Sequence, residues 1–369
     1  MMRNFVRAAV VMAAVVAPAI TSAQARQGTP LDVQFSGLLY PQYVYGGQKG
    51  NATRSQNRFE LDRAYLTADA RLAERFTMKL TAEATQPIGG AGWVLRARHG
   101  YGEYAFWTNN KGWMGANAQA RFGIQPTVLI EHEEQFWPRW VAKVATERAG
   151  FFSAADVGVS TTAKVNGVEI FASAMNGSGY MVAENDRFKD YSLRVTLEPV
   201  DGMTLSPWYY KGLRKSTRTD AAHANEGRKR DRMGVLAAYR AKAWMVGGDY
   251  AVATNENETP TAQPFATTDQ SSKVISAYAR LKPLAMMDPK GNAAWGLLVR
   301  WDQIDSDNQF ALTGGDFPVL KGKFVVAGIT YDMNNRVSWS FDWQQQSPVG
   351  APAAGLDLRT YNVHASIGF

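Results

Sequence analysis

Basic side chains stand at alternate positions in several short segments of the chain, where they could bind anions. Because alternate residues of a strand share one face, these side chains would line a common surface. The planar guanidinium of arginine offers paired donors to two oxygens of an anion. The candidates for such a ladder of anion-binding groups are Arg63, Lys79, Arg96, Arg98, Arg121, Arg194 and Arg300.

Acidic side chains on the same faces leave a second interpretation open. They could pair with the basic residues across neighbouring strands, so that the surface is braced and nearly neutral. The acidic candidates are Glu60, Asp62, Glu83, Glu169, Glu198, Asp249, Asp302 and Asp342. Both interpretations predict a charged wall, and they differ in its net charge.

One further segment, over 127–155, combines carboxylates with a histidine. Its side chains of interest are Glu131, His132, Glu133, Glu134, Arg139 and Lys143. Histidine and carboxylates are plausible ligands for a divalent ion. A single histidine without a second one at i+4 is weak support for a metal, so we predict no metal site. A cluster of carboxylates at a narrow point and a plain exposed loop both remain open.

A basic run over 212–232 could gather anions and raise their local concentration. It could equally bind anionic lipopolysaccharide or remain a solvated loop. Its basic residues include Arg214, Lys215, Arg228, Lys229 and Arg230.

Catalysis and nucleic-acid binding find little support. The four histidines are His99, His132, His223 and His364, and no nucleophile motif accompanies them. Ser366 lies two strand positions from His364, about 6.6 Å away, which is too far for a hydrogen bond. Basic residues alternate with acidic ones and form no continuous stripe. We therefore expect no enzyme, no cofactor and no nucleic-acid partner.

The first 25 residues have the pattern of a secretory signal peptide. Arg3 and Arg7 precede an apolar run over 8–17, and small residues follow at Ala23 and Ala25. A membrane-spanning helix needs about 20 apolar residues, so this run is too short for one. We expect residues 26–369 to form the mature protein, a single domain without cysteine.

Hydrophobic and polar residues alternate with a period of two along the rest of the chain, which indicates strands. About sixteen such segments of about 10 residues follow one another, and no long amphipathic helix interrupts them. We place them at 33–45, 57–71, 75–86, 94–106, 114–126, 156–165, 167–176, 188–199, 203–212, 231–241, 243–254, 273–283, 293–304, 323–333, 336–346 and 358–369. The alternation slips within 58–65 and 96–104, where we predict β-bulges.

Short and long connections alternate between these segments. Long ones are expected at 46–56, 127–155, 177–187, 212–230, 255–272, 306–322 and 347–357. In a transmembrane antiparallel up-and-down β-barrel, short turns face the periplasm and long loops face outside. The sequence therefore predicts this all-β fold with about 16 strands.

The end of the chain supports barrel closure. An unpaired strand edge is costly in hydrocarbon, so we expect the last strand, 358–369, to pair with the first. Aromatic residues at strand ends would form girdles at the membrane interfaces. The candidates are Tyr40, Tyr43, Tyr45, Trp295, Trp301, Trp339, Trp343 and Phe369.

Five passages in register resemble the phosphate-selective porin O and P family. They are "NRFELDRAYLTADARLAERFTMKL", "ERAGFFSAADVGVSTTAKV", "GVEIFASAMNGSG", "AAWGLLVRWDQID" and "VVAGITYDMNNRVSWSFDWQQ". The resemblance runs from Val33 to Phe369 and implies a 16-stranded, trimeric porin of the outer membrane of a Gram-negative bacterium. It also implies that the loop 127–155 folds into the lumen and narrows the pore. Glu131, Glu133 and Glu134 depart from a simple anion filter there.

Three functions follow from these observations. The first is a passive porin for small hydrophilic solutes that prefers anions such as phosphate. The second is a general or cation-leaning diffusion pore, in which the loop glutamates dominate the constriction. The third is a receptor or adhesin barrel that conducts little. The expected partners are small anions or other small solutes, outer-membrane lipid and lipopolysaccharide, and two further copies of the chain.

Overall fold

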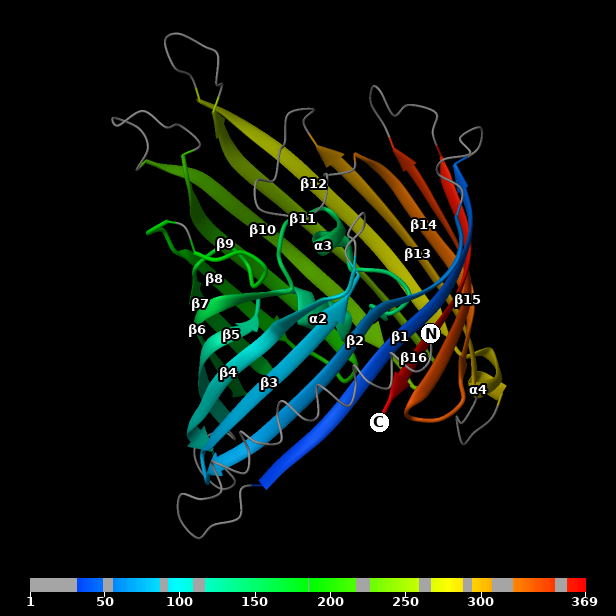
Figure 1. Cartoon of the computed structure of the whole chain (residues 1–369), viewed down its shortest axis with the longest axis horizontal. Coiled ribbons are helices and arrows are strands. Elements are labelled where there is room, and N and C mark those ends of the chain that lie inside the picture. Colours follow the sequence, from blue (N-terminus) through cyan, green and yellow to red (C-terminus); the bar gives the residue numbers. More distant parts are fainter. Residues whose placement is uncertain are drawn as a thin grey trace.

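The computed structural model describes residues 32–48, 56–86, 92–108, 117–184, 186–216, 226–258, 267–287, 294–306, 321–348 and 357–369. The expected signal peptide, 1–25, lies outside these residues. Sixteen antiparallel strands form one closed barrel (Figure 1). The predicted fold class is therefore confirmed.

Each strand pairs with its neighbours in the sequence, and the last strand pairs with the first. The strands are β1 (Asp32–Gln48), β2 (Gln56–Ala73), β3 (Phe76–Thr85), β4 (Val94–Thr108), β5 (Asn117–Pro126), β6 (Ala155–Val165), β7 (Val168–Met175), β8 (Asp190–Leu197), β9 (Met203–Lys215), β10 (Gly227–Arg240), β11 (Trp244–Glu258), β12 (Thr267–Leu281), β13 (Trp295–Ser306), β14 (Gly322–Asp332), β15 (Val337–Pro348) and β16 (Leu358–Gly368). Turns such as 166–167 and 333–336 mark the short-turn end of the barrel, and the connections 127–154 and 176–189 mark the long-loop end.

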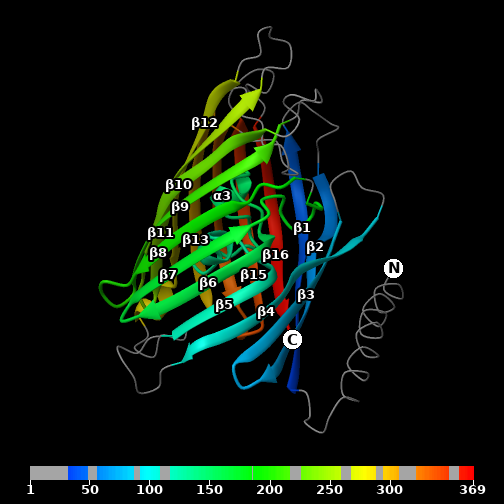
Figure 2. The ribbon, with the colours of Figure 1, turned by 90° about the vertical axis from the view of Figure 1, so that its left-hand side faces the viewer.

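Three short helices accompany the strands. They are α2 (Ile130–Glu134), α3 (Ala145–Arg148) and α4 (Pro283–Met287). None of the helices in the described ranges is long and apolar enough to cross a membrane. The first two lie inside the barrel, as the view from the side also shows (Figures 1 and 2).

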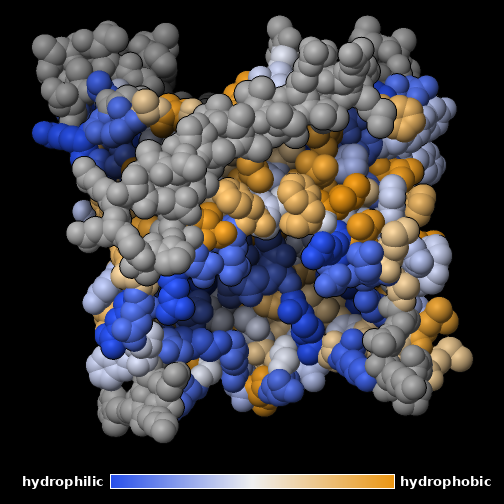
Figure 3. Space-filling view, turned by 60° about the horizontal axis from the view of Figure 1, so that its bottom comes forward, coloured by the Kyte–Doolittle hydropathy of each residue, from blue (hydrophilic) through white to orange (hydrophobic). Residues whose placement is uncertain are grey.

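Alternation along the strands places apolar residues outside and mostly polar residues inside. In β13, Leu297 and Val299 are exposed on the outer surface, whereas Arg300 and Asp302 are buried in the interior. A soluble protein would show the opposite arrangement. Seen from the short-turn end, hydrophilic side chains surround a hollow at the centre of the molecule (Figure 3).

The barrel closes through the last residues of the chain, as predicted. The amide of Gly37 donates to the carbonyl of Phe369 at 3.1 Å, and the amide of Phe369 donates to the carbonyl of Gly37 at 3.1 Å. The Phe369 ring lies over Gly37 so closely that a Cβ at this position would overlap it. A residue without a side chain is therefore needed in β1 to seat the terminal ring.

Both predicted β-bulges are present. Asp62 is the extra residue in β2, because Tyr40 pairs with Arg63 and Pro41 pairs with Leu61. Arg98 is the extra residue in β4. A bulge reverses the alternation, so Arg98 and His99 are both buried in the interior despite being adjacent.

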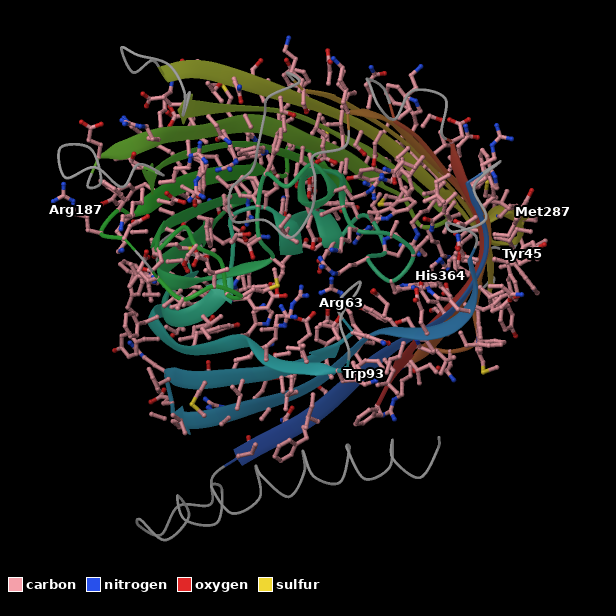
Figure 4. The ribbon with its side chains drawn as sticks, turned by 45° about the horizontal axis from the view of Figure 1, so that its top comes forward. Tyr45, Arg63, Trp93, Arg187, Met287 and His364 are labelled. Atoms are coloured by element: carbon pink, nitrogen blue, oxygen red, sulfur yellow. The ribbon has the colours of Figure 1, made fainter. Side chains whose placement is uncertain are left out.

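Three predictions about the strands were wrong: the place of Tyr40 and the lengths of the loops 212–230 and 255–272, the last because β11 continues to Glu258 and β12 begins at Thr267. Tyr40 is only 9% exposed and packs edge-on against Tyr65, with ring centroids 5.8 Å apart, because its position in β1 faces the interior. By contrast, Tyr45 lies on the outer surface (Figure 4). The predicted loop 212–230 is too long, because β9 continues to Lys215 and β10 begins at Gly227.

Candidate functional site

The loop 127–154 crosses the interior of the barrel, and side chains of the wall bind its backbone. The Arg300 Nη1 donates to the carbonyl of Lys143 at 2.8 Å, and the Gln344 Nε2 donates to the carbonyl of Val141 at 3.0 Å. Arg194 donates to the carbonyl of Val128 from β8. Buried carbonyl groups need such partners, so the wall fixes the path of the loop.

Apolar packing holds one side of the loop against the wall. The loop contributes Leu129, Ile130, Trp137, Val144 and Phe151. Inward-facing residues of the wall complete this inner core, among them Trp208, Leu236, Val274, Leu298 and Val326. Each fully buried side chain of this size contributes about 1.5–3 kcal/mol. The loop therefore packs against strands β9 to β14 through an apolar core, as a helix or loop does in a soluble protein.

The opposite side of the loop meets β2, β3 and β4 through charged residues. The Arg139 guanidinium lies between the carboxylates of Glu134 and Glu147, with Nη2 donating to Glu147 at 2.7 Å. Arg98 Nη2 lies 3.7 Å from Glu134, and Arg63 pairs with Glu83. We call these six residues the constriction cluster: Arg63, Glu83, Arg98, Glu134, Arg139 and Glu147. Three arginines and three glutamates leave it without net charge.

Ionisation within the loop is consistent with these contacts. Burial opposes ionisation of Glu147, but Arg139 and Lys143 outweigh it and lower the pKa of Glu147 to about 2. Burial lowers the pKa of Lys143 to about 8, although Glu147 counteracts part of the shift. At neutral pH the carboxylate of Glu147 is therefore charged.

The residues of "EHEE" do not act as one group. Glu131 is 42% exposed and lies 3.2 Å from His99 Nε2. His132 and Glu133 are buried against the wall, so the segment is neither a single cluster of carboxylates at a narrow point nor a plain exposed loop, the two alternatives left open by the sequence. The short helix α2 causes this separation, because successive helical residues point about 100° apart. No group of three possible metal ligands occurs within the described part of the chain.

Burial shifts the pKa of both buried members of this segment towards the neutral form. His132 Nε2 lies 2.8 Å from the Ser206 Oγ, and burial, together with Arg194, lowers its pKa to about 3. The Thr146 hydroxyl donates to Glu133 Oε2 at 2.6 Å, and the Glu133 carboxyl also shares a hydrogen bond with the carboxyl of Asp249 on β11. Burial and the nearby Asp249 raise the pKa of Glu133 well above its usual range.

A cavity of about 740 Å³ opens between the loop and the wall towards the long-loop end. Its basic lining residues are Arg63, Arg96, Lys143, Arg214, Arg230 and Arg232, and its acidic ones are Asp62, Glu83, Glu147, Asp156 and Asp190. The six basic groups exceed the five acidic ones by a single charge. Arg63 points into the interior in Figure 4.

The seven predicted ladder residues all lie on strands, but they separate into four places. Arg63 and Arg96 line the cavity, and Arg98 belongs to the constriction cluster. Lys79 lies 3.4 Å from Asp69, and Arg121 lies 2.6 Å from Glu103.

Arg194 and Arg300 lie beneath the loop instead. Arg194 pairs with Glu169 at 2.8 Å, and Arg300 pairs with Asp302 at 2.7 Å. For these two residues the structure shows the paired wall, the second of the two interpretations left open, and both residues also hold the loop in place.

Several residues of the predicted basic loop lie on strands instead. Arg214 and Arg230 project from strands into the cavity, and Arg228 is buried beside Glu226, with Nη2 2.6 Å from its carboxylate. Lys215 is exposed, and Lys229 lies 3.8 Å from Asp269. Residues 217–225 of this segment lie outside the described residues.

A serine, a histidine and an aspartate lie close together near β16, but their arrangement differs from that of a catalytic triad, in which the histidine lies between the serine and the aspartate. Asp342 accepts a hydrogen bond from Ser340 at 2.8 Å and lies 3.3 Å from His364 Nε2. The carboxylate stands between the two other groups, so the histidine is not placed to take the serine proton.

Residues absent from the predicted sites complete the cavity. Phe152, Tyr210 and Asn255 line it, together with Arg232, the last residue of the predicted basic run 212–232. A sequence signal exists for Arg232, which shares the parity of Arg228 and Arg230 on one strand. No signal indicates Phe152, because its place depends on the path of the loop.

Comparisons with known proteins establish the fold of this barrel. No family model and no curated protein matches the chain. Among solved structures, OmpF of Salmonella typhi aligns with a TM-score of 0.62 at 13% identity, over 91% of this chain and 97% of that one. The anion-selective porin of Comamonas acidovorans aligns with a TM-score of 0.62 at 10% identity, over 92% of this chain and 100% of that one.

A third structure, a loop-deletion mutant of the outer-membrane protein OmpT of Vibrio cholerae, gives a TM-score of 0.61 at 10% identity, over 92% of this chain and 99% of that one. The chain therefore has the 16-stranded fold of bacterial outer-membrane porins. At these identities the likeness concerns the fold alone, and the phosphate-selective family remains a prediction.

Proposed function

We propose that the protein is a diffusion porin of the outer membrane, which lets small hydrophilic solutes pass without catalysis. The observation that carries this proposal is the loop 127–154, which narrows a closed barrel whose outer surface is apolar. Such a barrel is stable only in lipid, and a charged, water-accessible interior serves solutes that cannot cross lipid. Export through the predicted signal peptide would deliver the chain there.

The cavity favours anions weakly. Its lining carries one more basic than acidic group, and most of these groups are paired. Pores select by their radius and by the charge that lines them, so a nearly balanced wall gives modest selectivity. Phosphate is the inorganic anion that the sequence resemblance implies, and arginine is suited to its oxygens.

A cation-leaning pore is the second candidate. Glu131 supports it, because its side chain is 42% exposed on the loop and its counterpart His99 is a histidine rather than an arginine. If this carboxylate dominates the narrowest point, cations would be favoured.

Partners follow from the outer surface. The outward face of β2 to β5 combines small residues, including Ala68, Ala82 and Ala120, with exposed apolar ones such as Leu80 and Phe122, and would let another barrel pack against it. We propose a homotrimer built on this face, and lipopolysaccharide around the long-loop end, where Arg187 lies at the rim (Figure 4). Chemical crosslinking of the native protein tests the trimer: a ladder that ends at three copies supports it, and a monomer contradicts it.

The reversal potential of the protein in a planar bilayer, under a potassium chloride gradient, tests the function. An anion-sided potential that added phosphate shifts or blocks supports the first candidate, and a cation-sided one supports the second. Folded protein without conductance would contradict both. Arg139→Gln removes the cation between Glu134 and Glu147, so we expect it to shift the potential towards cations.

A further inference from the structure

Arg232 is a buried cation without hydrogen-bond partners for two of its nitrogen atoms. It projects from β10 into the interior and is 3% exposed. Its Nε and Nη1 atoms have no partner among the described residues. A buried guanidinium is normally paired, so these donors indicate that an acceptor is missing.

Neighbouring carboxylates do not supply this acceptor. Asp190 is already bound by Arg230 and by the Tyr210 hydroxyl, and its Oδ1 accepts from the Leu213 amide at 3.2 Å. Gly177 and Gly212 enclose the same carboxylate so tightly that a Cβ on either would overlap it. Asp190 is thus fixed by other groups, and the Nε and Nη1 atoms of Arg232 remain without a hydrogen-bond partner among the described residues.

Aromatic rings surround the Arg232 guanidinium. Its central carbon lies 4.9 Å from the centroid of the Tyr210 ring and 5.7 Å from that of Phe152. The two rings meet edge to face, with centroids 5.3 Å apart. Rings in this arrangement hold the cation by cation–π attraction without consuming its N–H groups.

The cavity beside Arg232 has room for a solute with an apolar body. Phe152, Met175 and Tyr210 contribute to its lining, together with the Asn255 side chain. The Asn255 Oδ1 is buried and likewise has no partner among the described residues. Cavities of about 300–1,000 Å³ accommodate small organic ligands, and this one, at about 740 Å³, falls in that range.

We infer that this corner of the cavity is a binding subsite for small aromatic carboxylates on their way through the pore. The carboxylate would accept hydrogen bonds from Arg232, and the ring would lie against Phe152 and Tyr210. An inorganic anion could use the arginine but would leave the aromatic surface in contact with water. The inference deepens the proposed porin function and rests on it.

Benzoate is a suitable probe, with acetate and inorganic phosphate as comparisons. We would measure its binding to the detergent-solubilised protein by calorimetry and its block of potassium chloride current in a bilayer. We expect benzoate to bind at least about tenfold more tightly than either comparison anion, since only benzoate uses both the cation and the rings. Equal binding of phosphate would overturn the aromatic class.

Two variants and a matched control locate the site. Arg232→Gln should weaken benzoate binding about tenfold or more, because a charge-assisted hydrogen bond is lost. Arg359→Gln removes an exposed arginine of β16 that pairs with Asp357 and does not line the cavity, so it should leave binding unchanged. Phe152→Leu keeps the loop packed but removes a ring, so it should weaken binding of benzoate and not that of acetate.

The outcomes separate this inference from the porin function. If the unmodified protein conducts but binds no benzoate, the subsite is wrong and the porin stands. If Arg232→Gln folds and binds benzoate as before, the assignment to Arg232 is wrong. If Arg232→Gln does not fold, Phe152→Leu decides. If the folded protein binds benzoate but passes no current, the porin function fails and the site belongs to a receptor.

Discussion

Trp137 anchors the loop 127–154 to the barrel wall, and its replacement by alanine should release the loop. The side chain is 1% exposed, and its Nε1 donates to the carbonyl of Ala142 at 2.9 Å. Its ring lies 6.0 Å from that of Tyr278, and the Arg300 guanidinium lies 5.0 Å from its centroid. The residue thus joins the loop to two strands of the wall.

The size of the effect follows from this burial. Removing a large buried aromatic side chain costs about 3–5 kcal/mol. If this cost falls on the docked state of the loop, the population of the displaced state rises roughly 10²–10⁴-fold. We expect single-channel recordings of Trp137→Ala to show frequent transitions to a larger conductance, because a displaced loop no longer narrows the lumen.

Trp107→Ala is the matched control, since Trp107 is 49% exposed and lies outside the inner core. It should leave the current unchanged. The heat-dependent mobility of each variant on denaturing gels would show that its barrel is folded. Recordings of folded Trp137→Ala that match the unmodified protein in conductance and noise would refute the idea that the inner core holds the loop.

Two further predictions concern the seam of the barrel and the buried acid. Gly37→Ala places a methyl group within the Phe369 ring, so the barrel of this variant should unfold on gels at a lower temperature. The control is Gly92→Ala, whose methyl group meets nothing within 4 Å and should leave the unfolding temperature unchanged. Equal unfolding temperatures of the two variants would contradict the role of Gly37. The raised pKa of Glu133 means that its contribution to loop docking is complete below the usual carboxyl pKa and is lost as pH rises through the raised one. Excursions to the larger conductance should therefore increase as the pH rises above the usual carboxyl range. Glu133→Gln should abolish this dependence, and an unchanged dependence would show that another group is responsible.

The strands of this protein could be predicted closely from the sequence. Period-two alternation is strong in a barrel because one face meets lipid and the other meets polar groups, and a terminal strand such as 358–369 cannot remain unpaired. The bulges at Asp62 and Arg98 were equally visible, since a bulge reverses the alternation that precedes it. Boundaries near Lys215 were missed because the polar strand ends resemble loops.

The interior of the barrel was much harder to predict. Leu236, Val274 and Val326 occupy inward positions where polar residues were expected, and only the docked loop explains them. Arg194 and Arg300 could not be told from pore-lining arginines, because their partners are carbonyl groups of that loop. The N–H groups of Arg232 lack hydrogen-bond partners because Arg230 and Tyr210 bind Asp190, and these contacts become apparent only in the folded structure.

The inner core has a consequence for how this chain reaches its folded state. The protein carries two apolar surfaces, an outer one that requires lipid and an inner one that requires the loop 127–154. A barrel that closed before the loop docked would expose Leu236 and Val274 to water trapped in its lumen. Loop docking is then a condition of productive assembly rather than a late adjustment, and defects in the loop should appear first as poor insertion into the membrane.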